Sequence, residues 1–399
     1  MLAKKAVPLH ANCDKMLFQD IIGQERTKQQ LRNAVQKGLI PHAQLFTGPE
    51  GVGKLQLAIA YAQYLACPNR TNQDACGTCP TCLQYSKLQH PDLHFVFPIV
   101  KNETGDVCDD FIDDFRQLIL DKHYFNLDDW HTALGVETKQ SLIYEKESSE
   151  ILRKLSLKAF SDGYKIMIIW QPQKMNATCA NKLLKILEEP PQKTIFLLVT
   201  EQPDLLLTTI LSRVQQVRVP KLTENDIRNG LVAYGFNQQQ ADDWAHIANG
   251  SFLNALHLAN ESGDNKRYLS DFIALMRDAY TIGHISNAAK KAESLQRIRK
   301  WSLDMADAKV GRERQKAFLQ YAQKQVRENY IANLQQPQLN YQTAEEREFS
   351  QRFAPYINDT NVEQIMNELD KAEQQITQNG NAKIIFFDLC LQFIVLLKK

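Results

Sequence analysis

The stretch "HAQLFTGPEGVGKLQLAIAYAQYLAC", residues 42–67, contains the pattern that decides the fold. A short apolar run leads into a glycine-rich turn, and a long apolar segment with helical spacing follows, which predicts a buried strand, a tight loop and a helix. The turn "GPEGVGKL", residues 48–55, is close to the phosphate-binding pattern G-x-x-x-x-G-K followed by Ser or Thr. In such a loop, backbone N–H groups and the start of the helix surround phosphate oxygens.

The residues of this loop divide into those that keep the pattern and one that departs from it. Gly48, Gly51 and Gly53 permit the tight backbone, and Lys54 would neutralise the β- and γ-phosphates of ATP. Leu55 stands where a hydroxyl normally ligates magnesium. The sequence therefore predicts the loop geometry, leaves nucleotide binding open and argues against hydrolysis.

A second apolar run bears on hydrolysis as well. Enzymes of this type carry acidic residues at the end of a second buried strand, where they hold magnesium and orient water. The matching strand is "YKIMIIW", residues 164–170, and "QPQKMN" follows it. Trp170, Gln171 and Gln173 carry no charge, so a second part of the magnesium apparatus is missing.

Further strands alternate with helices along this part of the chain. "HFVFPIV", residues 94–100, and "TIFLLVT", residues 194–200, are continuous apolar runs typical of strands covered on both faces. "LLLTTILSRVQQVRVP", residues 205–220, predicts a helix and a short strand. Strands that alternate with helices indicate a parallel sheet.

The pattern changes at Lys221, after which helical spacing dominates to the end of the chain. We therefore predict an α/β domain over residues 1–220, a small helical domain over 221–264 and a second helical domain over 265–399. Residues 102–147 are acidic with interspersed aromatic side chains, and we interpret them as an insertion or an elaborated crossover.

Four cysteines gather in "CPNRTNQDACGTCPTC" with the spacing C-x8-C-x2-C-x2-C. Four thiolates satisfy a tetrahedral zinc ion, and each C-x2-C pair places two sulfurs on one ion. The alternatives are free thiols or a redox pair, and four cysteines within this module, residues 67–82, argue against both. We predict a closed structural zinc site with these ligands: Cys67, Cys76, Cys79 and Cys82.

Composition limits the remaining function classes. Lys plus Arg number 47 and Asp plus Glu 46, so the chain has no overall basic field for nucleic acid. Residues 1–15 have no apolar core of signal-peptide length. The apolar run at residues 384–397 is short for a membrane span and contains Asp388. We expect a cytoplasmic protein without a membrane partner, in a reducing compartment that disfavours disulfides.

One arginine has a position that allows catalysis in another subunit. In "TTILSRVQQ", Arg213 follows Ser212 at a predicted helix end. An arginine there can reach a neighbouring subunit's nucleotide and stabilise transition-state charge. The alternative is an ordinary surface arginine, and spacing alone favours that interpretation because surface charges are common.

Several segments occur together in an order that resembles one family. They are "FQDIIGQE", "HAQLFTGPEGVGK", the four cysteines, "MNATCANKLLKILEEPP" and "TTILSRV". In this combination and order the chain resembles bacterial clamp-loader subunits of the AAA+ class. The resemblance covers most of residues 15–260 and continues more loosely into 309–323.

Within this class the chain is similar to the delta-prime group, which belongs to the DNA polymerase III clamp loader. Active gamma/tau relatives keep a Thr after the loop lysine, an acidic box and a nucleotide-sensing Arg. Here Leu55, the sequence "WQPQ" and Leu253 take those places. The resemblance makes Ser212-Arg213-Val214 the counterpart of a Ser-Arg-Cys motif, so it implies that Arg213 is an arginine finger acting in trans.

The resemblance implies an AAA+ module with an inserted zinc site, a helical lid domain and a helical collar. It implies a pentamer with delta and gamma/tau subunits, which opens the sliding clamp and closes it on primed DNA. The chain would then be no enzyme by itself but a component of the DNA polymerase III holoenzyme. Two alternatives remain: an active AAA+ ATPase of the gamma/tau type, and a zinc-dependent DNA-binding protein, which the near-zero net charge disfavours.

Overall fold

The structure is a computed structural model of the chain. It describes residues 16–103, 105–136, 141–160, 163–260, 262–307, 310–336 and 339–398. Residues 1–15, on which the expectation of no export signal rests, lie outside these ranges. The chain divides into two compact units, Met1–His257 and Leu258–Lys399.

Unit 1 is built on a five-stranded parallel sheet with the strand order β2-β3-β4-β1-β5. The strands are β1 (Ala43–Thr47), β2 (Leu93–Val96), β3 (Lys165–Trp170), β4 (Thr194–Thr200) and β5 (Gln215–Arg218). The parallel sheet predicted from the alternation of strands and helices is confirmed. Because β1 is parallel to its neighbours, the loop that follows it lies at the carboxyl end of the strands. Proteins with α/β sheets bind ligands at this end.

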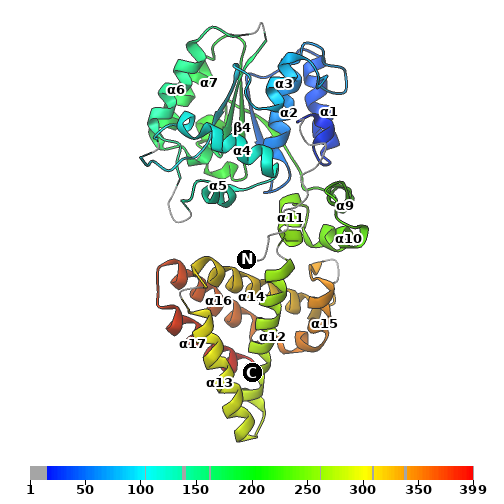
Figure 1. Cartoon of the computed structure of the whole chain (residues 1–399), viewed down its shortest axis with the longest axis vertical. Coiled ribbons are helices and arrows are strands. Elements are labelled where there is room, and N and C mark those ends of the chain that lie inside the picture. The colour runs from blue at the N-terminus through cyan, green and yellow to red at the C-terminus, as the bar shows by residue number, and fades with distance from the viewer. Residues whose placement is uncertain are drawn as a thin grey trace, which may run out of the picture. The chain divides into compact units, whose positions relative to one another are not determined.

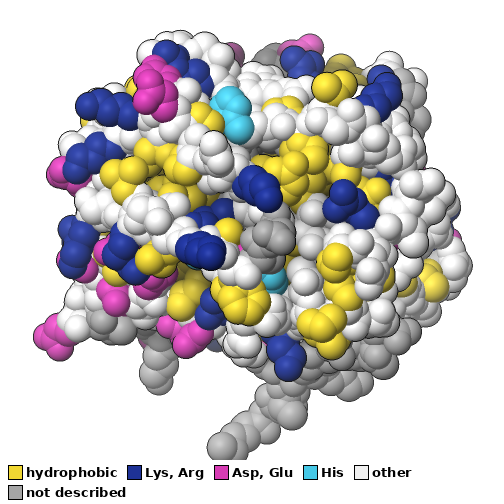
Figure 2. Space-filling view, turned by 90° about the horizontal axis from the view of Figure 1, so that it is seen from above, with side chains coloured by type: hydrophobic (Ala, Val, Ile, Leu, Met, Phe, Trp, Pro, Cys, Tyr) yellow, Lys and Arg dark blue, Asp and Glu magenta, His cyan; other side chains and the backbone are white. Residues whose placement is uncertain are grey.

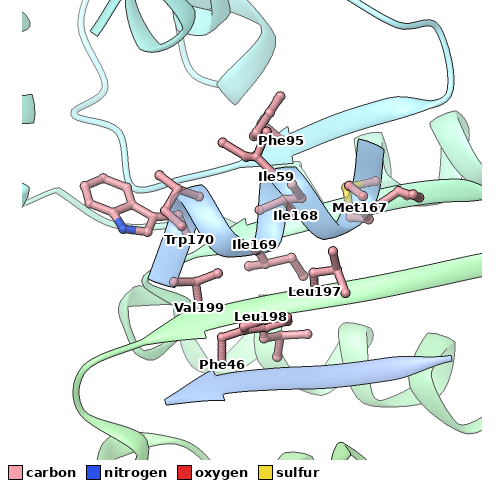
Figure 3. Close-up of a cluster of buried hydrophobic side chains, with 14 of the residues drawn as sticks. Phe46, Ile59, Phe95, Met167, Ile168, Ile169, Trp170, Leu197, Leu198 and Val199 are labelled. Atoms are coloured by element: carbon pink, nitrogen blue, oxygen red, sulfur yellow. The ribbon is translucent and has the colours of Figure 1, made fainter. Parts of the chain in front are cut away.

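The central strands are buried along their whole length. β1, β3 and β4 have no exposed residue, which agrees with their continuous apolar runs. In the register, Ile168 lies opposite Leu197, and Leu198 lies opposite Leu45. Ile59, on the helix that follows the glycine loop, lies beside Ile168 in the same apolar cluster (Figure 3).

Helices cover both faces of this sheet (Figure 1). The chain moves one way along the sheet from β1 to β2 and the other way from β2 to β4, so right-handed crossovers place the connecting helices on opposite faces. One side carries α1 (Glu25–Gln36), α2 (Lys54–Ala66) and α3 (Pro80–Ser86), and the other carries α6 (Glu145–Ser156) and α7 (Ala177–Glu188). Short turns complete the unit: η1 (Phe18–Asp20), η3 (Pro172–Lys174), η4 (Pro203–Leu205) and α8 (Thr208–Leu211).

The predicted strand over residues 94–100 is shorter in the structure. β2 ends at Val96, and Pro98, two residues on, has no N–H group for a continued ladder. Ile99 instead forms an isolated antiparallel bridge with Leu142. Ile99 precedes the segment interpreted as an insertion, residues 102–147, and Leu142 lies near the end of it. Its described residues form η2 (Cys108–Phe111), α4 (Ile112–Lys122) and α5 (Leu127–Ala133).

A helical group follows the sheet. It consists of α9 (Glu224–Ala233), α10 (Gln238–Ile247) and α11 (Phe252–Asn260). These helices have an apolar cluster of their own, which includes Ile227, Leu231 and Phe252 together with Tyr124 from the 102–147 segment. A separate cluster is what a lid domain requires, although residues up to His257 belong to the same compact unit as the sheet. The division at residues 221–264 stays a prediction.

Unit 2 is helical over its described residues, as the sequence predicted. Its helices are α12 (Ser262–His284), α13 (Ala288–Met305), α14 (Arg312–Asn333), α15 (Ala344–Phe353), η6 (Ala354–Tyr356), α16 (Val362–Thr377) and α17 (Ala382–Leu396). Phe272, Phe318, Leu369 and Phe386 are fully buried in its core. No helix in the part of the chain that the structure describes is long and apolar enough to cross a membrane.

Candidate functional site

The glycine loop has the predicted geometry between β1 and α2. Gly51 and Gly53 adopt φ angles of 74° and 87°, a region that favours glycine. A Cβ atom on Gly48 would lie 2.0 Å from the carbonyl oxygen of Val219, so only glycine fits there. The sequence thus placed this loop correctly, at the start of a helix of thirteen residues.

Lys54 is buried and lies against the loop. Its Nζ donates to the carbonyl oxygen of Pro49 and lies 3.4 Å from Oε1 of Glu201, which directly follows β4. Burial lowers the pKa of Lys54, and Glu201 opposes that shift. The sequence reasoning missed Glu201, although a carboxylate at the end of a buried strand beside the loop is a readable signal.

The helical group of α9, α10 and α11 contacts the same loop through α11 and the residue before it. The backbone N–H of Phe252 donates to the carbonyl oxygen of Gly51 at 2.9 Å. A Cβ on Gly51 would lie 2.1 Å from Oγ of Ser251 and 2.7 Å from Cβ of Leu253. Leu253, where the family resemblance places a nucleotide-sensing arginine, therefore packs directly on the loop as a buried apolar side chain.

The end of β3 is filled by aromatic side chains. Trp170 is buried, and its ring centroid lies 5.6 Å from that of Phe115 and 5.4 Å from that of Phe125. Gln171 adopts a left-handed backbone conformation with φ 57°, and its N–H donates to the carbonyl of Val199 at 2.9 Å. An indole packed in this way offers neither charge nor an oxygen ligand to a metal.

The connection between α4 and α5 also contacts the loop. Asn126 donates from its side-chain nitrogen to Oε1 of Glu50, a loop residue, at 3.3 Å. Tyr124 contacts Gly53: a Cβ there would lie 3.1 Å from the tyrosine ring. The sequence reasoning missed these contacts, because an acidic segment with aromatic residues does not reveal which surface it covers.

The four predicted cysteines come together between the end of α2 and the start of α3. Their Sγ atoms all lie within 4.8 Å of one another. Cys67 caps the end of α2, whereas Cys79 caps the start of α3 and Cys82 lies in its first turn. The Sγ–Sγ distances are 3.6 Å for Cys67–Cys76, 4.0 Å for Cys67–Cys79 and 3.9 Å for Cys76–Cys82.

These distances fit a tetrahedral ion. Zn–S bonds of about 2.3 Å give sulfur–sulfur distances of about 3.8 Å. Backbone N–H groups also point at the sulfurs, with Cys79 N–H 3.3 Å from Sγ of Cys76 and Cys82 N–H 3.4 Å from Sγ of Cys79. Hydrogen bonds from Thr78 and Cys79 lower the pKa of Cys76 to about 6, while burial raises the pKa of Cys67 and Cys82. The cluster can hold one metal ion.

Arg213 lies away from the glycine loop. It stands two residues before β5, whose first residue pairs with Gln44 near the start of β1. The loop follows the other end of β1, so about 13 Å of strand separates the two levels along the sheet. Arg213 Nη2 lies 2.6 Å from Oε1 of Glu188, and its Nη1 donates to Oγ of Ser212 at 3.1 Å. The structure brings Ser212 and Arg213 together but does not place them with Lys54.

These observations define the class of protein. A glycine loop between a buried strand and a helix, a parallel sheet in this strand order, and helices packed on the loop together form an AAA+-like α/β P-loop fold. The four-cysteine cluster is an addition to that fold.

The family follows from a sequence comparison. The family described as "DNA polymerase III, delta subunit" matches residues 23–223, about half of the chain. The chain belongs to this family. The matched range includes the glycine loop, the four cysteines and Arg213.

Known relatives come from two groups of DNA polymerase III subunits. The chain is 29% identical over 226 residues to the delta' subunit of Bacillus subtilis, covering 57% of this chain and 56% of that protein. It is 28% identical over 258 residues to the tau subunit of Escherichia coli, covering 62% of this chain and 34% of that protein. The chain thus spans about half the length of the first relative and a third of the second.

Among solved structures, a DNA polymerase III gamma subunit-related protein from Thermotoga maritima superposes with a TM-score of 0.40 at 13% identity. The aligned region covers 93% of this chain and 99% of the Thermotoga maritima chain.

Proposed function

We propose that this chain is a delta-prime-type subunit of the DNA polymerase III clamp loader that does not hydrolyse ATP itself and supplies Arg213 to a neighbouring subunit's nucleotide. The observation that carries the proposal is the placement of Arg213. It lies at the end of the sheet where the strands begin, whereas its own glycine loop follows the other end of β1, and 36% of its side chain is exposed. A guanidinium that is distant from the glycine loop of its own subunit and partly exposed is suited to act on the nucleotide of a neighbouring subunit.

The missing magnesium apparatus supports the silent role. Leu55 is buried in the core, and Trp170 is held by Phe115 and Phe125. Neither position has an oxygen for a metal, and two such losses remove both the ligand and the group that orients water. The phosphate loop Gly48, Gly51, Gly53 and Lys54 then serves as a scaffold.

The cysteine cluster is proposed as a structural zinc site. When bound, zinc would crosslink the end of α2 to the start of α3 through four thiolates and leave no open coordination position. Asp74, in the loop between the first two cysteines, accepts hydrogen bonds from the N–H groups of Phe18 and Gln19. The module therefore also fixes residues 16–24, the entry segment that leads to α1.

The partners follow from the proposed role. They are gamma/tau and delta subunits, held together by unit 2 as a collar, with the sliding clamp and primed DNA reached through the complex in the cytoplasm. The face drawn in Figure 2 alternates apolar side chains with Lys, Arg, Asp and Glu rather than presenting one continuous basic field. This mixture favours a subunit of a complex over an independent DNA-binding module.

The test is a loader reconstituted with gamma/tau and delta subunits. Arg213→Ala is expected to lower DNA- and clamp-stimulated ATPase activity by about tenfold or more, while the assembly stays intact by gel filtration. Arg218→Ala, an exposed arginine at the other end of β5, serves as the control. Unchanged turnover with Arg213→Ala would defeat the finger assignment.

The second candidate, an active ATPase, has one observation in its favour, since Glu201 lies beside Lys54. Magnesium-ATP turnover by the chain alone decides between the two. Turnover at ordinary enzymatic rates that disappears in Lys54→Ala would replace our proposal.

A further inference from the structure

We infer that Tyr124 occupies the nucleotide pocket of this chain and determines that the pocket does not accept an adenine nucleotide. The inference deepens the proposed silent role and gives residues 102–147 a function in it. It concerns binding rather than hydrolysis, so it can fail while the role of Arg213 stands.

The phenol ring of Tyr124 contacts three parts of the chain: the glycine loop, the segment before α1 and α11. Its edge contacts Gly53, where a Cβ would lie 3.1 Å from Cε1 and 3.2 Å from the hydroxyl oxygen. Its hydroxyl accepts a hydrogen bond from the backbone N–H of Ile22 at 3.3 Å. Its ring packs on Phe252 with centroids 4.9 Å apart and an interplanar angle of 64°. Loop, entry segment and α11 all contact one side chain, which is 5% exposed.

This position is the one that a nucleotide would need. The phosphates would lie on the loop N–H groups, and the sugar and base would have to lie beside the loop, between the elements that flank it. Tyr124 presents there a flat aromatic ring and one hydrogen-bond acceptor on a backbone N–H. A bound base offers the same two features, so the side chain takes both the volume and the polar contact that a base would use.

The backbone around Tyr124 holds the ring in place. His123, the residue after α4, has φ 52° and ψ −56°, a conformation that is unfavourable for a non-glycine residue and persists only where packing enforces it. Asn126 caps α5 by accepting from Asp129 N–H, and its amide reaches Glu50 in the loop. Between them, Phe125 packs on Trp170. One short connection therefore contacts the loop, the place of the lost acidic box and the group that includes α11.

A second contact, between α5 and α11, lies close to this connection. Nε2 of His257 on α11 lies 3.9 Å from Oδ2 of Asp129 on α5. Gly51 simultaneously accepts the N–H of Phe252. The 102–147 segment is thereby connected both to the loop and to α11, so that Tyr124 is held between them.

The test titrates ATP and ADP onto the full chain by calorimetry. Wild type and Tyr124→Phe, which keeps the ring, are expected to show no binding at the highest nucleotide concentration titrated, whereas Tyr124→Ala is expected to bind with a Kd about tenfold or more below that concentration. That binding should disappear in Tyr124→Ala/Lys54→Ala. Tyr234→Ala is the matched control, because the Tyr234 ring also packs on Phe252, with 5.1 Å between the ring centroids, and its removal should leave Tyr124 in place.

Binding by the wild type, or a folded Tyr124→Ala without any binding, would overturn the inference. A second measurement covers the case in which Tyr124→Ala does not fold. Tyr124→Phe removes only the hydroxyl, so amide hydrogen exchange at Ile22 is expected to accelerate about fivefold or more. Equal exchange at Ile22 in wild type and Tyr124→Phe would overturn the assignment of this contact.

Discussion

Arg213 and Glu188 form an ion pair with 2.6 Å between Nη2 and Oε1. Glu188 is the last residue of α7, and Arg213 follows α8 just before β5, so both lie where the strands begin. About half of the glutamate and a third of the arginine side chain are exposed. A nucleotide phosphate of another subunit would therefore compete with a solvated carboxylate for the guanidinium, which is a weak competitor.

Removal of this carboxylate should release the arginine. Glu188→Gln is expected to leave the melting temperature of the chain nearly unchanged, because an exposed pair contributes less than about 1 kcal/mol. In the reconstituted loader it should raise ATPase activity without DNA by up to about fivefold, the equivalent of that energy. Glu189→Gln, the adjacent exposed carboxylate, is the control. A loss of activity like that of Arg213→Ala would instead show that Glu188 positions the arginine for catalysis.

Metal removal should affect the module formed by α2 and α3 first. Elemental analysis is expected to give one zinc per chain, and a strong chelator should lower the melting temperature because the four thiolates then lose their crosslink. Cys76→Ser should abolish stoichiometric zinc. Cys179→Ala removes a buried thiol outside the cluster and should retain it. Wild-type protein that is free of metal after preparation without chelators would contradict the site.

The sequence predicted those features that depend on local spacing. The buried strands, the glycine loop and the four cysteines follow from short patterns, and the structure reproduces them with small shifts at strand ends. Contacts between distant segments were not predictable in this way. The sequence shows aromatic side chains in the 102–147 segment, but the partners of Tyr124, Ile22 and Gly53, are set by where that segment folds back. The pairing of Glu188 with Arg213 was missed for the same reason, whereas Glu201, directly after a buried strand, had a signal that could have been read.

The contact between Gly51 and α11 predicts a large difference between two glycines. Gly38 and Gly51 have similar φ angles of 67° and 74°, but a Cβ on Gly38 meets nothing within 4 Å. Gly38→Ala should therefore cost only the left-handed backbone penalty, about 1–2 kcal/mol. Gly51→Ala should cost at least about 2 kcal/mol more, because the methyl group would displace Ser251 and Leu253. Urea unfolding measures both, and equal costs would show that α11 does not rest on the loop.

His94 on β2 predicts a dependence of stability on acid. Burial lowers its pKa to about 4, with the Lys154 and Lys165 charges adding to the shift and Asp92 and Asp109 opposing it. In the unfolded chain histidine titrates near 6.5. Between those values the unfolded chain binds more protons, so the contribution is complete above pH 6.5 and is lost as the pH falls through 4.

The size of this contribution is up to about 3 kcal/mol. His94→Gln should therefore flatten the fall in unfolding free energy from pH 7 to 4, measured by urea titration at half-unit steps. Burial also lowers the pKa of His90 and His131, but both remain in each chain, so the difference between the two curves reports His94 alone. Parallel curves for wild type and His94→Gln would mean that the imidazole is solvated, and that β2 at the edge of the sheet is not covered as the structure shows.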